Sequence, residues 1–134
     1  MKTRLYPVCY LLLVALCLMA QGCGTNQLNI AAKSILTAQE AYDATLSASA
    51  QAYKDGFLSD ESKEKIIAVG AIAHDSIQLA QTSLLVALDA STKENMSKLD
   101  AAIAALRENV SMLIGQAVAL GVKIYGAAVT YKGE

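Results

Sequence analysis

The chain has 134 residues and a formal net charge of −1. A mildly acidic balance argues against nucleic-acid binding, which relies on basic surface patches. The length suits a single domain. The chain has one proline, few glycines, no tryptophan and abundant alanine. This composition predicts an all-α protein.

The N-terminal segment has the order of a secretory signal. Lys2 and Arg4 precede an apolar run, Leu5 to Ala20, and the small residue Gly22 comes just before Cys23. A basic start, an apolar middle and a small-residue end are typical of a signal peptide. The apolar run is shorter than the about 20 residues that a membrane-spanning helix needs. We therefore expect a signal peptide over residues 1–22 and a helical domain over residues 23–134.

The residues around Cys23 resemble the signal class of bacterial lipoproteins, in which a modified cysteine follows glycine or alanine. Gly22 fits this pattern, whereas Ala20 and Gln21 stand where the class has leucine and a small residue. The resemblance implies cleavage between Gly22 and Cys23, and three acyl chains, such as palmitate, that anchor the protein in a membrane. Because Gly24 is not aspartate, it also implies the inner leaflet of the outer membrane, facing the periplasm. Two alternatives stay open: cleavage at the same bond without lipid, and an uncleaved N-terminal anchor.

Removal of the signal changes both the charge and the cysteine count. The remaining 112 residues carry nine basic and twelve acidic side chains, a net charge of −3. Cys9 and Cys17 are lost with the signal, so Cys23 is the one cysteine left. A chain with one cysteine has no internal disulfide framework. Helix packing must then hold the domain together.

Two helices are predicted first, over about residues 27–55 and 60–89, separated by a turn at Gly56. Phe57 and Leu58, the apolar residues of this turn, are expected to close the end of the core. Ser59 is expected to cap the second helix. Apolar side chains recur at spacings of three and four along each helix. In the first helix they are Leu28, Ala32, Ile35, Tyr42, Leu46 and Tyr53; in the second they are Ile66, Gly70, Ala73, Ile77, Ala80, Leu84 and Leu88. A second row on the second helix, Ile72, Leu79 and Val86, predicts contact with a second neighbour.

A third helix is predicted over about residues 92–130. Ser91 and Glu94 have the spacing of a capping box, which marks its start. Its apolar positions alternate three and four residues apart, as in a coiled coil; they run from Met96 through Leu106 to Tyr131. Short turns between helices favour antiparallel neighbours. The expected fold is an up-down-up three-helix bundle with a long third helix, preceded by the signal helix.

The far end of the predicted third helix is unusually apolar. From Met112 to Tyr131 the only charged residue is Lys123, and two shorter helices could not cover this end. It could cap its own core, form an interface with a second copy or another protein, or insert into a membrane. The interface candidates are Leu113, Ala117, Leu120, Ile124, Tyr125 and Tyr131.

No catalytic or metal-binding constellation is found in the sequence. His74 is the only histidine, and one histidine with one cysteine cannot form a zinc site. Helix capping explains the acidic residues Asp60, Glu61 and Glu64. A glycine-rich phosphate loop is absent. We therefore expect a protein that is not an enzyme and that binds no cofactor and no metal.

Two functional hypotheses follow. The first is a small envelope lipoprotein that acts as an interaction or structural module. The second is a membrane-active, holin- or pore-like helical protein that uses the end of the third helix or an uncleaved N-terminus. Residues 53–61 also resemble a helix–turn–helix linker of small uncharacterised helical proteins, some carried by phages, and this resemblance implies no function.

Overall fold

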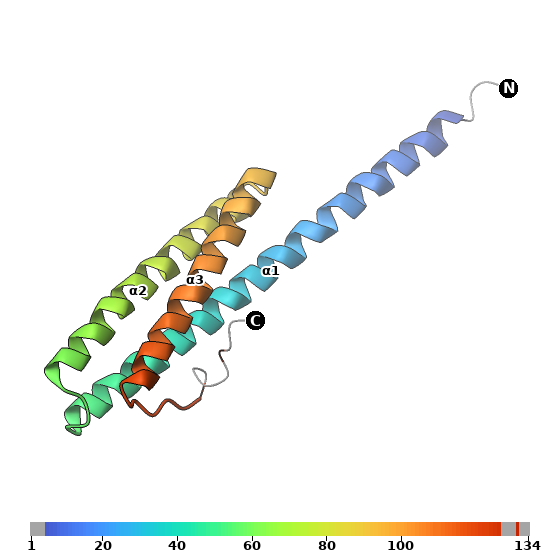
Figure 1. The fold of residues 1–134 in the computed structure, drawn as a ribbon. Helices are drawn as coiled ribbons and strands as arrows, with labels where there is room; N and C mark the ends of the chain where they lie inside the picture. The colour runs from blue at the N-terminus through green and yellow to red at the C-terminus, as the bar shows by residue number, and fades with distance from the viewer. Residues whose placement is uncertain (1–4, 127–130, 132–134) are drawn as a thin grey trace.

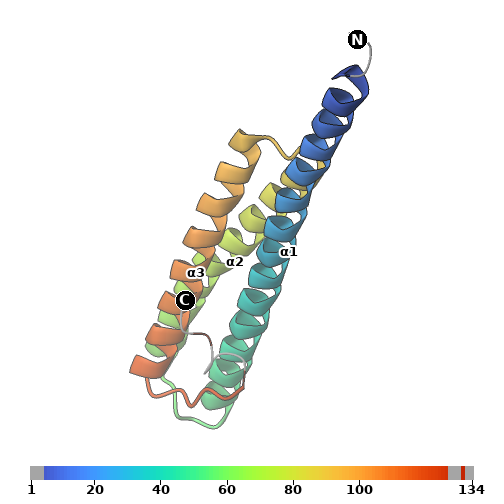
Figure 2. The ribbon, with the colours of Figure 1, turned by 90° about the vertical axis from the view of Figure 1, so that its right-hand side faces the viewer.

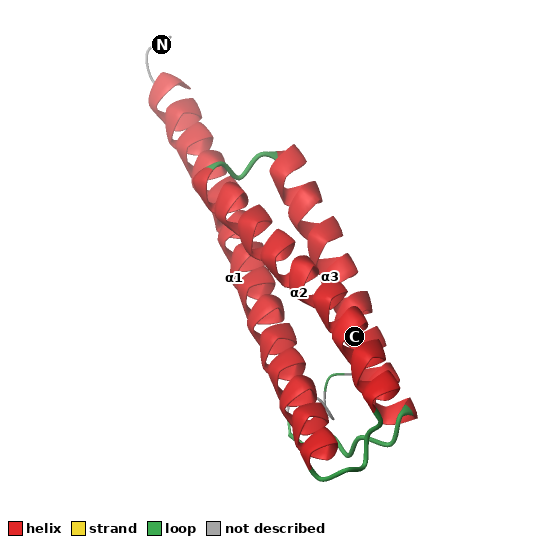
Figure 3. Cartoon of the chain, turned by 90° about the vertical axis from the view of Figure 1, so that its left-hand side faces the viewer, coloured by secondary structure: helices red, strands yellow, loops and turns green. Residues whose placement is uncertain are grey.

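The protein is an all-helical bundle. The computed structural model describes residues 5–126 and 131, with the side chains of residues 25–126 and 131. Its helices are α1 (Leu5–Lys54), α2 (Asp60–Asp89) and α3 (Lys93–Ala119), and the described residues include no strand (Figure 3). Each helix contacts the other two, and consecutive helices run in opposite directions (Figures 1 and 2). The predicted all-α class is confirmed.

The first helix is longer than expected. No boundary occurs at Gln27, where the sequence predicted the domain's first helix to begin, because α1 is continuous from Leu5 to Lys54. The expected signal segment is thus the first part of α1, and it extends beyond the ends of α2 and α3 (Figure 1). Neither Gly22 nor Gly24 ends the helix. A single helical glycine weakens a helix by roughly 1 kcal/mol but does not end it.

The second helix has the bounds that the sequence predicted. Ser59 is its N-cap, and the Ser59 hydroxyl oxygen accepts a hydrogen bond from the backbone N–H of Ser62 at 3.2 Å. Asp60 and Glu61 occupy the first turn, where the positive end of the helix dipole favours carboxylates. Sequence and structure agree here because the cap is a local interaction.

The third helix begins one residue later than expected. Its N-cap is Thr92, whose hydroxyl oxygen accepts from the N–H of Asn95 at 3.1 Å. The predicted capping box is wrong, because the Ser91 hydroxyl donates to the Ala87 carbonyl at 2.9 Å. Glu94 instead accepts from Lys98 one turn further on, at 2.6 Å.

The third helix also ends much earlier than expected, so the predicted long helix over residues 92–130 is wrong. It stops at Ala119, and Gly121 takes a positive φ of 88°. The N–H of Val122 donates to the Ala117 carbonyl at 3.0 Å, and the N–H of Gly121 donates to the Val118 carbonyl at 2.9 Å. This pair of bonds is the Schellman motif, which ends helices at a left-handed glycine. Residues 127–130 of the predicted helix lie outside the described residues.

The helix α1 ends in the same way, at the turn that leads to α2. Gly56 has a φ of 78°, and the N–H of Phe57 donates to the Ala52 carbonyl at 2.9 Å. Leu58 is buried beneath the turn, as predicted for a residue that closes the core. Phe57 was expected to do the same, but its side chain is 80% exposed.

The core combines one helix of large side chains with two of mostly small ones. The largest fully buried side chains include four on α3: Leu99, Leu106, Val110 and Leu113. The buried positions of α1 and α2 are mainly alanine, glycine, serine or threonine, with isoleucine at Ile35, Ile66 and Ile77. Small faces let helix backbones approach closely, so α1 and α2 can close around α3.

Candidate functional site

The predicted lipid-anchor position lies on α1. Gly22 and Cys23 fall inside its continuous helix, and their side chains are not among those described. This part of α1 is at the end of the bundle where α2 joins α3 (Figure 1). From Cys23 to Lys54 the helix advances 31 residues, which is about 46 Å at about 1.5 Å per residue. The two ends of the bundle are therefore well separated.

Neither a membrane-spanning helix nor a cluster of metal ligands is present among the residues whose side chains are described. Within residues 25–126 and 131, whose side chains the structure describes, no helix is both long and apolar enough to cross a membrane. No group of three or more histidine, cysteine, aspartate or glutamate side chains lies close enough there to hold a metal ion.

Most of the predicted interface residues belong to the bundle's own core. Leu113 and Ala117 are fully buried, which removes them from the surface. Leu120 and Ile124 are partly buried and pack against the core. Only Tyr125 stands out into solvent, with 75% of its side chain exposed. The apolar pattern after Ala119 therefore serves mainly to cover the core.

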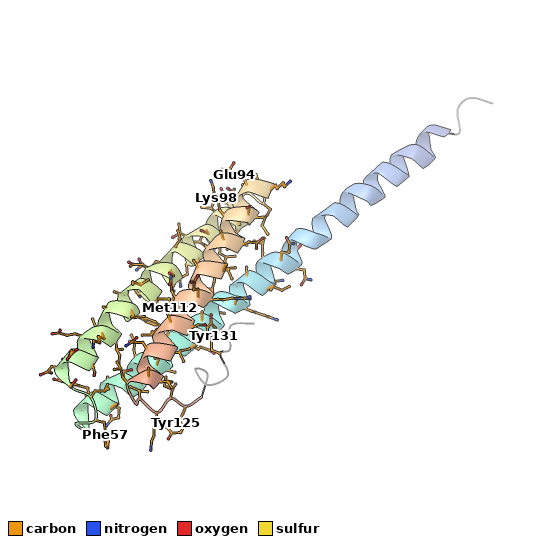
Figure 4. All side chains as sticks on the ribbon, viewed as in Figure 1. Phe57, Glu94, Lys98, Met112, Tyr125 and Tyr131 are labelled. Carbon is orange, nitrogen blue, oxygen red and sulfur yellow. The ribbon has the colours of Figure 1, made fainter. Side chains whose placement is uncertain are left out.

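Tyr131 lies against the side of the bundle and not at its end (Figure 4). Its hydroxyl is buried and has no hydrogen-bond partner among the described atoms. Burial raises the pKa of Tyr131, and the nearby positive charge of Arg107 partly offsets this rise. The Arg107 guanidinium, on α3, also donates to the Ser34 hydroxyl of α1 at 3.2 Å. The chain after α3 thus returns toward the middle of the bundle.

The end opposite the anchor position carries a hollow flanked by two aromatic side chains. Its volume is about 480 Å³. The lining residues are Ala48, Gln51, Ala52, Asp55, Phe57, Leu120, Gly121, Lys123 and Tyr125. Phe57 and Tyr125 are the most exposed large hydrophobic side chains in the described part of the chain, and both lie at this end (Figure 4). We call these two residues the aromatic pair.

Sequence reasoning found only half of the aromatic pair. It selected Tyr125 but treated Phe57 as a core residue. The missed signal is that Phe57 directly follows Gly56, whose left-handed conformation ends α1 and redirects the chain. Leu58 then takes the buried position that the turn offers.

The prediction that α2 contacts two neighbours is confirmed, but its second apolar row does not make these contacts. Ile72, Leu79 and Val86 are each about half exposed. The helix α3 contacts α2 next to this row, where the Asn109 side chain donates to the Ser76 hydroxyl. The row itself stays on the outer surface.

His74 contacts other side chains but belongs to no cluster of ligands. Its ring centroid is 6.0 Å from that of Tyr42 on α1, and its Nε2 is 3.0 Å from the Gln78 amide nitrogen. Burial, followed by the charge of Asp43, raises the pKa of Tyr42. These contacts join α1 to α2 near the middle of the bundle.

Comparison of the chain with known protein families, curated proteins and solved structures finds no match.

Proposed function

We propose that the protein is a small bacterial envelope lipoprotein, anchored through Cys23, that acts as a non-enzymatic interaction or structural module. The basic start, apolar run and Gly22–Cys23 pair support this. The arrangement of the bundle is also compatible with it, because the first described core residue of α1 is Leu28, so cleavage before Cys23 would leave every described core residue in place. The expected location is the inner leaflet of the outer membrane, with the bundle in the periplasm.

The aromatic pair is the observation that carries the interaction role. Phe57 and Tyr125 are 80% and 75% exposed and flank a hollow about 46 Å from Cys23 along α1. Exposed aromatic side chains are enriched among the residues that dominate protein–protein binding. The module would hold the membrane at one end and present the aromatic pair to a protein partner or a second copy at the other.

The anchor is tested by the intact mass of the protein purified from bacteria grown with and without globomycin, an inhibitor of the lipoprotein signal peptidase. A chain that starts at Cys23 and carries added acyl mass is expected without the inhibitor. The Cys23→Ser variant should lose this added mass. An unmodified full-length chain in untreated cells would contradict the anchor.

The interaction role is tested by in-cell crosslinking of the wild type and a Phe57→Ser/Tyr125→Ser variant. The wild type should form one discrete crosslinked complex, and the variant should lose most of it. Leu36→Ser is the matched control, because Leu36 is 59% exposed on α1 and does not line the hollow. Equal crosslinking of both variants would count against the aromatic pair.

The alternative is a membrane-active, holin- or pore-like protein with an uncleaved N-terminus. The apolar run from Leu5 to Ala20 is the feature of the sequence that would serve this form. The form that inserts the end of α3 loses its support, because Leu113 and Ala117 are buried in the core. Leakage of dye from liposomes after addition of the full-length chain would favour the membrane-active protein over the lipoprotein.

A further inference from the structure

We propose a second site, a groove between α1 and α2 that binds a free fatty acid. The acyl chain would lie in the groove and the carboxylate would meet two lysines at its mouth. The groove shares no residue with the anchor position or with the aromatic pair. Only the choice of a free fatty acid over a bilayer lipid rests on the proposed anchor at Cys23.

The groove lies at the end of the bundle where α1 turns into α2. Its volume is about 390 Å³, within the range of about 300–1,000 Å³ typical of small-molecule sites. It is lined by Leu46, Ser49, Ala50, Tyr53, Lys54, Leu58, Lys63, Ile66 and Ile67. All of these residues come from α1, α2 or the turn between them.

Small side chains explain why the space is open. Ser49 and Ala50 line the groove together with Ile66 and Ile67, and their side chains are too short to fill it. About one turn earlier in α1, Leu46 approaches α2 at Gly70, where an added methyl group would be 3.4 Å from the Leu46 side chain. The helices α1 and α2 are thus in close contact at Leu46 and Gly70, and they are separated where Ser49 and Ala50 line the groove.

The groove interior has few polar groups to offer a ligand. The Ser49 hydroxyl already donates to the Thr45 carbonyl within α1 at 2.8 Å. The Tyr53 hydroxyl donates to the Asp60 carboxylate at 2.7 Å. With both donors engaged, an aliphatic chain suits the space better than a polar ligand.

The mouth of the groove selects the charge of the ligand. The only charged residues in the lining are Lys54 and Lys63. The Lys63 ammonium lies 4.2 Å from the centre of the Tyr53 ring, so its position at the groove edge is defined. A ligand with an aliphatic chain and a carboxylate end matches both the apolar residues and the lysines of the lining. An alkylammonium ion would be repelled by the lysines.

The position of the groove favours a free fatty acid over a bilayer lipid. Ser49 is 26 residues from Cys23 along the continuous α1 helix, about 39 Å. The acyl chains of one leaflet span only about 15 Å, half of the hydrocarbon core. Neither a lipid on Cys23 nor a lipid in the membrane that holds it would reach the groove.

The test uses the full chain, as produced by the cell, in lipid nanodiscs without detergent. A photoreactive diazirine analogue of dodecanoate is crosslinked, and the labelled residues are mapped by mass spectrometry after trypsin digestion. Saturable labelling should fall within residues 46–67. Unlabelled dodecanoate should compete, dodecanol should compete less well, and dodecylamine should not compete. Labelling spread evenly over the helices, or equal competition by dodecylamine, would overturn the proposal.

Variants of the lining provide the matched comparison. Ala50→Trp fills the groove and should reduce labelling at least about fivefold, whereas Ala101→Trp, at an exposed position of α3, should not. Lys54→Gln/Lys63→Gln should weaken competition by dodecanoate about fivefold, as expected for two solvent-accessible ion pairs. Lys33→Gln/Lys93→Gln is the control for lost charge. Unchanged labelling in Ala50→Trp, with helix content and thermal unfolding as in the wild type, would also overturn the proposal.

Discussion

The helices α2 and α3 are similar in length, at 30 and 27 residues, yet they use their hydrophobic residues in opposite ways. The helix α3 buries leucine and valine, with Leu106 fully inaccessible. The helix α2 buries mainly small residues and leaves six large ones exposed: Ile67, Ile72, Leu79, Leu85, Val86 and Leu88. Hydrophobicity alone therefore does not say which side of a helix faces the core.

The difference follows from side-chain volume. The large side chains of α3 need space, and the small faces of α1 and α2 provide it without pushing the backbones apart. Ala38 and Ala41 on α1, and Ala73 and Ala80 on α2, are all fully buried. Because interiors are packed as densely as crystals, small residues on two helices leave room for large side chains on the third. The core is specified by this pairing of sizes.

The largest effect is expected where α3 loses a large buried side chain. Leu106→Ala should lower the free energy of unfolding by about 2–5 kcal/mol, because it removes apolar contacts and leaves a cavity. Leu79→Ala, at an exposed position of α2, should change it by at most about 0.5 kcal/mol. Denaturant unfolding followed by circular dichroism measures both. Similar losses in the two variants would show that Leu79 is also covered, as it would be in a stable oligomer.

The next effect is expected where α2 gains a large side chain on its small face. Ala80→Leu should destabilise the protein by about 1–3 kcal/mol, because Ala80 has no accessible surface and the helices packed against α2 cannot move away without cost. Ala71→Leu places the same side chain on the exposed side of α2 and serves as the control. Thermal unfolding of the two variants gives the comparison. If Ala80→Leu unfolded at the same temperature as the wild type, the core would not require a small residue at this position.

Local chemistry predicted the start and end of α2 and the glycine turn that precedes it. The end of α3 could not be predicted in the same way. The three–four alternation continues past Ala119 through Leu120 and Ile124, because the segment that folds back must also cover the core. Apolar periodicity indicates which residues are buried. It does not distinguish the buried face of a helix from a non-helical segment that packs on the core. Gly121 indicated an earlier helix end, but the prediction followed the longer apolar pattern.

The candidate site shows the same limit. Tyr125 was predicted to lie within the apolar end of the third helix, and it is exposed because that helix ends before it. Phe57 was assigned to the core because it is large and apolar. Whether Phe57 or Leu58 enters the core depends on the direction of the chain after Gly56, which no pattern of residue types specifies.

The end of α3 sets the length over which its large side chains meet the small faces, and Gly121 determines this end. Gly121→Ala should destabilise the protein by about 1 kcal/mol, because a φ of 88° strains any residue that has a Cβ atom. Asparagine tolerates this conformation better, so Gly121→Asn should cost less. No atom lies within 4 Å of the added methyl group, which excludes a clash as the cause. If chemical denaturation showed Gly121→Ala to be as stable as the wild type, the helix would have to continue through this position.

The smallest effects are expected at the glycine within each of the two compared helices, Gly115 of α3 and Gly70 of α2. Gly115 of α3 has open space around it, so Gly115→Ala should stabilise the protein by about 0.5–1 kcal/mol through helix propensity alone. Gly70 of α2 is buried, and its added methyl group would contact Leu46 at 3.4 Å and Leu113 at 3.9 Å. Gly70→Ala should therefore gain less than Gly115→Ala, in a paired thermal unfolding experiment. An equal gain would mean that the small face of α2 has room to spare at Gly70, and that close packing against α1 and α3 does not require glycine there.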